Sequence, residues 1–441
     1  MRFSLQTNRQ HLQTHPAISK KVSSTSRQAI RIRFLVITAC LVALAGCSLR
    51  DIHEQFRVTE NFGVINGTVK QSGSQQGPIM VNRYHKEGEV FVQDSHTRAG
   101  SGGKYLFYCL PGAYYIAAYI DVNKDGQFQQ GEDYDYHGSS TGQPAAVRVN
   151  PGQTVSVEAL DITGNLSAAS GEGKIRIELS PVAKNLGRIV VLDDPMFVAD
   201  NYSLGMWKPI EFLTRVGGGL LFLQPYQANK IPVLFIHGIN GGPTDWETAI
   251  RQLDRARFQP WVLYYPSGLR LNMISDYLAA ALSRLHDEYG FNQLFVVAHS
   301  MGGLITRSFV RKYLDRFPDQ AGVIRLVMTV NSPMAGMGSA ASGVSNSPLV
   351  VPAWRDVATD SDFLQDLHSW TWPAGIPYHL VFSYKTGGSN DGTVSLQSQI
   401  PLKLQAEAVR IYGFNQTHAE ILNDPAFLEL FHSILANGHD E

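Results

Sequence analysis

The stretch VVAHSMGGLI, residues 296–305, places a serine between a β-branched run and an apolar segment. The run that ends at Ala298 predicts a buried strand, and the segment from Gly302 onward predicts a helix. Small residues on both sides of Ser300 let the strand and helix backbones approach closely at a tight turn. The sequence therefore predicts a serine at the apex of a strand-turn-helix unit, at the helix N-terminus, where negative charge is favoured.

Apolar strands alternate with helical segments on both sides of this turn. A helix is expected over residues 274–289, because Ile274, Leu278 and Leu282 recur at helical spacing. Continuous apolar strands that alternate with helices are typical of a mostly parallel sheet covered by helices on both faces. The expected strands cover residues 231–236, 258–266, 293–298, 324–330, 378–384 and 408–413, preceded by strands at 174–179 and 188–192 and by the apolar run 217–226.

Two further reactive side chains follow strands of this predicted sheet. Asp391 lies in the loop KTGGSNDG, and His418 lies in FNQTH after the last strand. The carboxyl ends of parallel strands meet at one edge of a sheet, so we expect Ser300, Asp391 and His418 to lie together. A hydroxyl, a base and a carboxylate are the groups that nucleophilic catalysis requires. Residues that fit this edge less well are His299, His368 and His379 for the base, and Asp360, Asp362 and Asp366 for the acid.

Four motifs resemble the bacterial triacylglycerol lipase and esterase families, including relatives of the GPI inositol-deacylase group. They are IPVLFIHGINGGPTDW, YYPSG, AHSMGGLITR and NSPMAGMGSA, and the resemblance covers residues 231–441. It implies an α/β-hydrolase fold, in which AHSMG is the nucleophile elbow and the chain order is serine, acid, histidine. Ala298 stands where these families more often have glycine, and alanine is a common variant there.

The resemblance implies a role for each residue of the site. Ser300 would be the nucleophile, His418 the general base and Asp391 the acid that orients it. The backbone N–H groups of Ile239 and Met301 would form the oxyanion hole. This chemistry requires no metal and no organic cofactor.

Two further features follow from the resemblance. His237, which follows the strand 231–236, is expected to brace the oxyanion loop. Residues 334–373 would form an inserted cap or lid. Its apolar side chains would cover an acyl pocket, pack on the core, or do both. They are Leu349, Val350, Val351, Trp354, Phe363, Leu367, Trp370 and Trp372.

Three functions are compatible with this set of residues. The first is a serine carboxylester hydrolase, a lipase or esterase that cleaves a lipid or another acyl ester through an acyl-enzyme. The second is an acyltransferase or thioesterase that uses the same three residues. The third belongs to another class, a surface binding lipoprotein with an inert hydrolase fold.

Residues 1–46 predict a lipoprotein signal peptide rather than part of the fold. They hold seven Lys and Arg and no acidic residue, and Arg33 leads into the apolar run 34–45. That run is short for a membrane span and matches the apolar region of a secretory leader. The sequence LAGC, residues 44–47, resembles a bacterial lipobox and implies a lipid on Cys47. The alternatives are an ordinary signal peptide with an unmodified cysteine, or a buried helix.

A lipidated protein would lie in the cell envelope, with residues 47–60 as its tether. In proteobacterial lipoproteins, a residue other than Asp after the lipidated Cys, here Ser48, goes with outer-membrane sorting. We therefore expect a protein anchored in the outer membrane of a Gram-negative bacterium, whose partners are the membrane and an acyl ester. Cys40 lies in the leader, and Cys109 is then left without an internal disulfide partner.

Charge excludes nucleic acid as an expected partner. Seven of the 37 basic residues lie in the leader, which leaves 30 against 38 acidic residues. No basic cluster of the kind that contacts phosphates is present in the rest of the sequence.

Residues 61–165 predict a small all-β sandwich that precedes an α/β-hydrolase domain at 166–441. Short apolar runs separated by Gly, Asn and Ser turns are typical of such sandwiches. The piece GKYLFYCLPGAYYIAAYIDVNKDG, residues 103–126, resembles the transthyretin-like or carboxypeptidase-regulatory type of sandwich.

The segment DVNKDGQFQQGE, residues 121–132, has the ligand spacing of an EF-hand calcium loop. Its flanks predict strands rather than helices, so we expect a calcium loop between strands with a stabilising role. The alternative is a solvated Asp-Gly turn. The predicted ligands are Asp121, Asn123, Asp125, Glu132 and the backbone carbonyl of Gln127.

Overall fold

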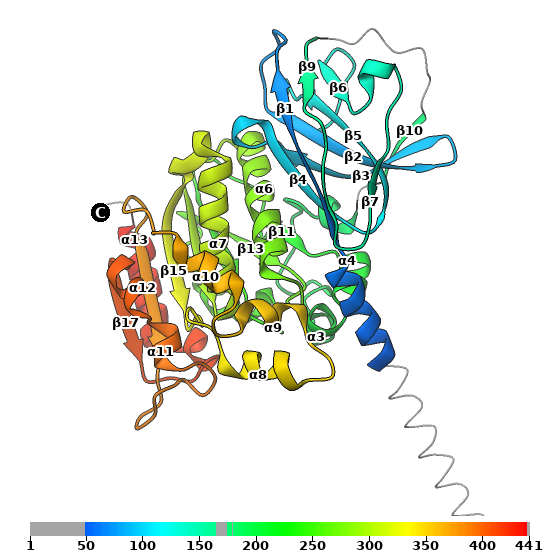
Figure 1. Cartoon of the computed structure of the whole chain (residues 1–441). Coiled ribbons are helices and arrows are strands. Elements are labelled where there is room, and N and C mark those ends of the chain that lie inside the picture. The colour runs from blue at the N-terminus through cyan, green and yellow to red at the C-terminus, as the bar shows by residue number, and fades with distance from the viewer. Residues whose placement is uncertain (1–48, 165–173, 179, 439–441) are drawn as a thin grey trace, which may run out of the picture. The chain divides into compact units, whose positions relative to one another are not determined.

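The computed structural model of the protein describes residues 49–164, 174–178 and 180–438. The predicted signal peptide and Cys47 lie outside these ranges. Residues Ile52–Glu441 form one compact unit. It contains a seven-stranded sheet and two smaller β-sheets (Figure 1).

The seven-stranded sheet has the order β11-β13-β12-β14-β15-β16-β17. Each neighbouring pair from β13 to β17 is parallel, and the edge strand β11 is antiparallel to β13. The six strands expected between residues 231 and 413 are all present, with small shifts at their ends. Their bounds are β11 Gly219–Phe222, β12 Ile231–Ile236, β13 Phe258–Tyr264, β14 Leu294–His299, β15 Ile324–Val330, β16 Tyr378–Ser383 and β17 Arg410–Phe414.

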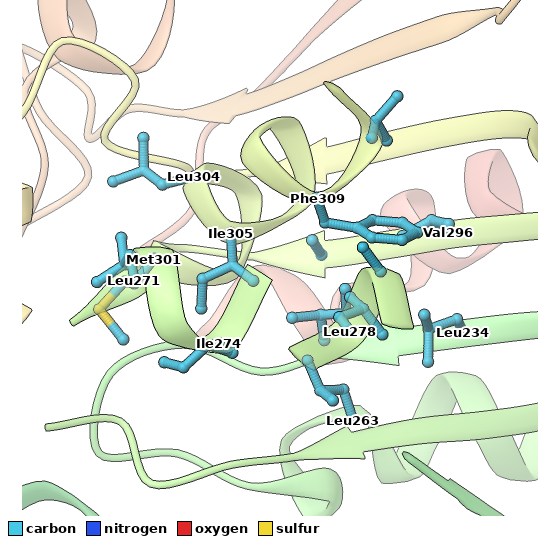
Figure 2. Close-up of a cluster of buried hydrophobic side chains, with 14 of the residues drawn as sticks. Leu234, Leu263, Leu271, Ile274, Leu278, Val296, Met301, Leu304, Ile305 and Phe309 are labelled. Carbon is cyan, nitrogen blue, oxygen red and sulfur yellow. The ribbon is translucent and has the colours of Figure 1, made fainter. Parts of the chain in front are cut away.

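Helices cover both faces of this sheet. Leu234 and Ile236 of β12 share a buried cluster with residues of α6 and α7, part of which Figure 2 shows. Val233 and Phe235 of the same strand share a second cluster with residues of α5 and α13. Because both faces of the inner strands β12 to β16 are buried, these strands are mostly apolar rather than alternating, whereas the edge strand β17 is largely exposed. These helices are α5 Glu247–Gln252, α6 Leu271–Tyr289, α7 Met301–Arg316 and α13 Pro425–Asn437.

Shorter helices occupy the connections. They are α2 Pro181–Lys184, α3 Ala199–Trp207, α4 Pro209–Arg215, α8 Gly338–Asn346, α9 Pro352–Val357, α10 Asp362–Ser369, α11 Leu396–Gln399 and α12 Leu402–Glu407. Within the described ranges, no helix combines the length and the apolar character that crossing a bilayer would need.

The chain that precedes the seven-stranded sheet forms the other two sheets. One has the order β4-β1-β8 with β9 beside β1, and the other β10-β3-β2-β5-β6 with β7 beside β5. Ile65 and Phe107 of the first sheet and Val81 and Ile116 of the second belong to one buried cluster, as expected for a sandwich. The bounds are β1 Gly63–Gln71, β2 Ile79–Glu87, β3 Val90–Arg98, β4 Lys104–Cys109, β5 Gly112–Ile120, β6 Tyr134–Tyr136, β7 Val147–Val149, β8 Thr154–Ser156, β9 Leu160–Ile162 and β10 Lys174–Ile177.

Two strands predicted at the start of the hydrolase domain differ from expectation. Strand β10 pairs with β3, so the β-rich part extends past the predicted boundary at residue 165. Residues 188–192 contribute one bridge, between Ile189 and Phe222, rather than a strand. An apolar run does not specify which sheet it joins, because strand formation depends on tertiary pairing.

Candidate active site

Ser300 lies at the turn between β14 and α7, as the sequence predicts. Its backbone has φ +54° and ψ −128°, an unfavourable conformation for a residue with a Cβ atom. Its N–H donates to the carbonyl of Val330 in β15 at 2.8 Å, which helps to hold the turn. The hydroxyl thus stands at the carboxyl edge of the sheet and at the N-terminus of α7, where negative charge is favoured.

The structure brings the other two predicted residues to Ser300. His418 Nε2 lies 2.9 Å from Ser300 Oγ, and His418 Nδ1 lies 2.7 Å from Asp391 Oδ2. Asp391 is fully buried, and its second oxygen accepts the N–H groups of Thr393 and Val394 at 2.8 and 2.7 Å. The three side chains therefore form one chain of hydrogen bonds from carboxylate to hydroxyl.

The carboxyl of Asp391 is held in its ionised form. Burial alone would raise its pKa, but hydrogen bonds from His418 and from the N–H groups of Val394 and Thr393 outweigh burial, so the pKa is lowered. An ionised Asp391 requires the proton of His418 on Nδ1. Nε2 is then able to accept the proton of Ser300.

The turn after β12 lies against Ser300. A Cβ atom on Gly238 would lie 2.9 Å from Ser300 Cβ, and one on Gly302 would lie 2.6 Å from the carbonyl oxygen of His237. Both positions therefore require glycine. Among the described residues, no hydrogen-bond acceptor is found for the N–H groups of Ile239 and Met301.

A known protein-family model agrees with this architecture of parallel strands, two helical layers and a turn at Ser300. Residues 231–372 match the model described as the alpha/beta hydrolase fold. The chain has an α/β-hydrolase fold. In this fold the three aligned side chains lie at the carboxyl edge of the sheet, where ligands bind in open α/β sheets.

Several solved structures are similar to this chain over about half of its length. A gene product of Listeria innocua has 16% identity and a TM-score of 0.37, over 47% of this chain and 94% of its own. A structure from work on LipS and LipT, two metagenome-derived lipolytic enzymes, has 16% identity and a TM-score of 0.37, over 51% and 98%. A thermophilic esterase from Thermogutta terrifontis has 15% identity and a TM-score of 0.34, over 50% and 94%. No curated protein matches the chain.

Two residues that were given no role from the sequence hold the backbone of His418. His299 Nε2 lies 2.8 Å from the carbonyl oxygen of His418, and Asn331 Nδ2 donates to the same oxygen at 3.0 Å. Burial lowers the pKa of His299 to about 3, so its neutral ring can donate from Nε2. The sequence signal for Asn331 was its place in NSPMAG directly after an expected strand.

The predicted lid, residues 334–373, packs on the core in both its earlier and its later part. Val351 and Val357 of the earlier part, like Phe363 and Trp372 of the later part, are buried in the cluster that contains residues of α6 and α7. In the earlier part, Asp356 of α9 accepts the N–H of Leu271, which starts α6, at 2.7 Å. Helix α8 is more exposed than its neighbours. A movable lid stays a prediction.

The predicted calcium loop joins β5 and β6, in agreement with its β-rich flanks. Its carboxylates accept backbone N–H groups, Asp121 those of Asp125 and Gly126, and Glu132 those of Val122 and Gln129. Burial raises the pKa of Asp121 and of Glu132, a cost that a bound cation would offset.

Other observations at this loop favour a plain turn. In the described ranges, no three His, Cys, Asp or Glu side chains are grouped closely enough to hold a metal ion. The Arg284 side chain of α6 donates to the carbonyl of Lys124 at 3.1 Å and to that of Asp125, which brings a positive charge to the loop. The calcium site therefore stays a prediction.

If the loop binds calcium, chelation should lower the melting temperature while turnover of a small ester at low temperature stays constant. Binding to the folded state alone adds ~2.7 kcal/mol when calcium is a hundredfold above Kd. Asp121→Asn and Glu132→Gln should each abolish the calcium-dependent shift, because each removes a charged ligand and keeps the shape. A melt that is identical with and without chelator would identify the loop as a solvated turn.

Proposed function

We propose that the protein is a serine hydrolase that cleaves carboxylic esters, with lipid acyl esters as the substrate class. The observation that carries the proposal is the chain of hydrogen bonds that joins Asp391, His418 and Ser300 at a positive-φ turn. Such an arrangement activates a hydroxyl that is otherwise a weak nucleophile.

The first half of the reaction would acylate Ser300. Ser300 Oγ attacks the ester carbonyl carbon while its proton passes to His418 Nε2. The ionised Asp391 stabilises the resulting imidazolium through Nδ1. The tetrahedral intermediate collapses, the bond to the alkoxide breaks, and His418 returns the proton to the leaving alcohol. The second half repeats these steps with water as the nucleophile and releases the carboxylic acid.

The developing oxyanion would accept hydrogen bonds from the N–H groups of Ile239 and Met301. Met301 follows Ser300 in the chain, and Ile239 follows Gly238, on which a Cβ atom would lie only 2.9 Å from Ser300 Cβ. Each fixed donor contributes ~2.7–4 kcal/mol to transition-state stabilisation in enzymes of this type.

An acyl chain as part of the substrate is proposed from the lipase-like motifs IPVLFIHGINGGPTDW and NSPMAGMGSA. Helix α8, in the segment that follows NSPMAG, packs on Trp354 of α9, where a Cβ on Gly343 would lie 2.9 Å from the ring. Apolar side chains line most small-molecule sites, so this segment is the proposed cover of the acyl chain. The same machinery would serve an acyltransferase or thioesterase, because only the acceptor or the leaving group differs.

A panel of substrates separates these activities. The purified protein would be assayed with glycerides, phospholipids, soluble 4-nitrophenyl esters and acyl thioesters, with product analysis for transfer to added alcohols. Release of free carboxylic acid from oxygen esters supports the proposal. Dominant acyl transfer or thioester cleavage supports the second function, and no turnover of any substrate favours an inert binding protein.

We also propose a lipid anchor at Cys47, on the basis of LAGC after the apolar run 34–45. Cys47→Ser should abolish incorporation of labelled palmitate and move the protein from the membrane to the soluble fraction, since the anchor depends on that thiol. Unchanged partition with membranes would mean that the apolar run itself remains as an uncleaved anchor. Outer-membrane sorting would be read from the density of the fraction that holds the wild type.

A further inference from the structure

The turn after β12 carries the N–H group of Ile239, which would bind the oxyanion, and hydrogen bonds hold the chain on both sides of this group. Asn240 has φ +53°, so the turn is strained and needs outside contacts to keep its shape. The carbonyls of His237 and Gly238 and the N–H of Asn240 are all hydrogen-bonded. Within the described ranges, the N–H of Ile239 itself makes no hydrogen bond.

The side chain of His237 fixes the peptide plane that carries this N–H. His237 Nδ1 lies 2.8 Å from the carbonyl oxygen of Gly238. In a trans peptide the carbonyl and the next N–H point in opposite directions, so fixing Gly238 O fixes the direction of the Ile239 N–H. Burial lowers the pKa of His237 to about 4, so the ring is neutral, with its proton on Nδ1.

Tyr265 and Ser267, from the motif YYPSG after β13, contact both ends of the turn. The Tyr265 hydroxyl donates to the carbonyl of His237 at 2.6 Å. The Tyr265 ring stacks on the imidazole, with centroids 4.0 Å apart and planes 11° apart. Ser267 Oγ accepts the N–H of Asn240 at 2.9 Å. Both residues are buried, and neither is part of the Ser300 hydrogen-bond chain.

We infer that Tyr265 and Ser267 are positioning residues that hold the Ile239 N–H in the direction of the oxyanion. The inference rests on the proposed function. These residues do not touch the reacting atoms but act through His237 and Asn240, which flank Gly238 and Ile239. A donor fixed in advance contributes more than one that must reorient during the reaction. Loss of either contact should therefore weaken transition-state binding more than substrate binding.

The variants Tyr265→Phe and Ser267→Ala each remove one oxygen and keep the rest of the side chain. Tyr264→Phe is a matched control, since it removes a buried hydroxyl that donates to the carbonyl of Met196 at 3.1 Å. Ser283→Ala is the second control, because Ser283 Oγ is buried with no partner among the described residues. For each protein, kcat and KM would be measured with a 4-nitrophenyl ester, per site titrated with a fluorophosphonate. The Kd of a trifluoromethyl ketone, which forms an oxyanion on serine, and the melting temperature would also be measured.

We expect kcat to fall roughly 10- to 100-fold in Tyr265→Phe and in Ser267→Ala, below the ~10²–10³-fold cost of losing a donor outright. KM should stay within about threefold, and ketone affinity should fall in parallel with kcat/KM. Tyr264→Phe and Ser283→Ala should keep the wild-type kcat and KM per titrated site and the wild-type ketone affinity.

A lowered melting temperature with wild-type kcat and ketone affinity would overturn the inference, since the contacts would then stabilise the fold alone. Equal losses in Tyr264→Phe would overturn it as well. A wild-type protein that neither hydrolyses esters nor binds the ketone would overturn the proposed function, and the inference with it. Either of the two variants suffices for the test if the other fails to fold.

Discussion

Ser300→Ala is expected to lower kcat for ester hydrolysis by roughly 10⁴- to 10⁶-fold, the range seen when a serine nucleophile is removed. Alanine lacks the oxygen that would form the acyl-enzyme, and no other hydroxyl hydrogen-bonds to His418 Nε2 among the described residues. The melting temperature should change little, because alanine keeps the Cβ atom and the backbone bond to Val330 and removes only the hydroxyl. The measurement is steady-state hydrolysis of a soluble ester alongside a thermal melt.

A control variant is needed to show that the loss of ester hydrolysis in Ser300→Ala is specific to the Ser300 hydroxyl. Ser308→Ala is a matched control, because Ser308 is a buried serine in helix α7, which follows Ser300, and its hydroxyl contacts Ser275 rather than the site. It should retain near wild-type activity. Activity of Ser300→Ala within tenfold of the wild type would exclude Ser300 as the nucleophile.

Asp391→Asn is expected to lower kcat by about 10⁴-fold, although the side chain keeps its size. An amide at this position can donate to His418 Nδ1, which shifts the ring proton to Nε2. In that form His418 cannot accept the proton of Ser300. The measurement is kcat at pH 7–8 for the variant and for Asp362→Asn, a surface control at the start of α10.

Stability should change with pH in a direction that follows from the pKa of Asp391. The folded-state pKa is lowered, so the ionised carboxylate stabilises the native state above its unfolded pKa of ~3.9. That contribution is lost as pH falls through the folded value. Urea melts should therefore show a gap in unfolding free energy between wild type and Asp391→Asn at pH 7, and this gap should begin to close below about pH 5. A gap that widens on acidification would contradict the lowered pKa.

Much of the fold was predictable from local sequence patterns. The strands from Ile231 to Ser383 are buried on both faces, so their apolar runs are nearly continuous and easy to recognise, whereas the edge strand β17 is largely exposed. The turn at Ser300 was predictable because small residues are required where two backbones meet. At Gly302, for example, a Cβ atom would lie only 2.6 Å from the carbonyl oxygen of His237. Asp391 and His418 could be assigned because each follows a strand that ends at the same edge.

What was not predictable depends on contacts between distant segments. Strand β10 joins β3, a pairing that the sequence of Lys174–Ile177 does not encode locally. The contacts of Asn331 with the His418 carbonyl and of Ser267 with the Asn240 N–H are also tertiary. Polar residues in loops after strands are common, so only the folded chain reveals which backbone groups they meet.

Labelling with a fluorophosphonate tests the central claim most directly. The reagent phosphonylates an activated serine and not an ordinary hydroxyl, because the reaction requires the adjacent base and the oxyanion hole. We predict one adduct per wild-type chain, located by tandem mass spectrometry on Ser300 in the peptide that contains AHSMGG, and none in Ser300→Ala. An unlabelled wild-type chain, or an adduct that persists in Ser300→Ala, would contradict the assignment of Ser300 as the nucleophile of a serine hydrolase.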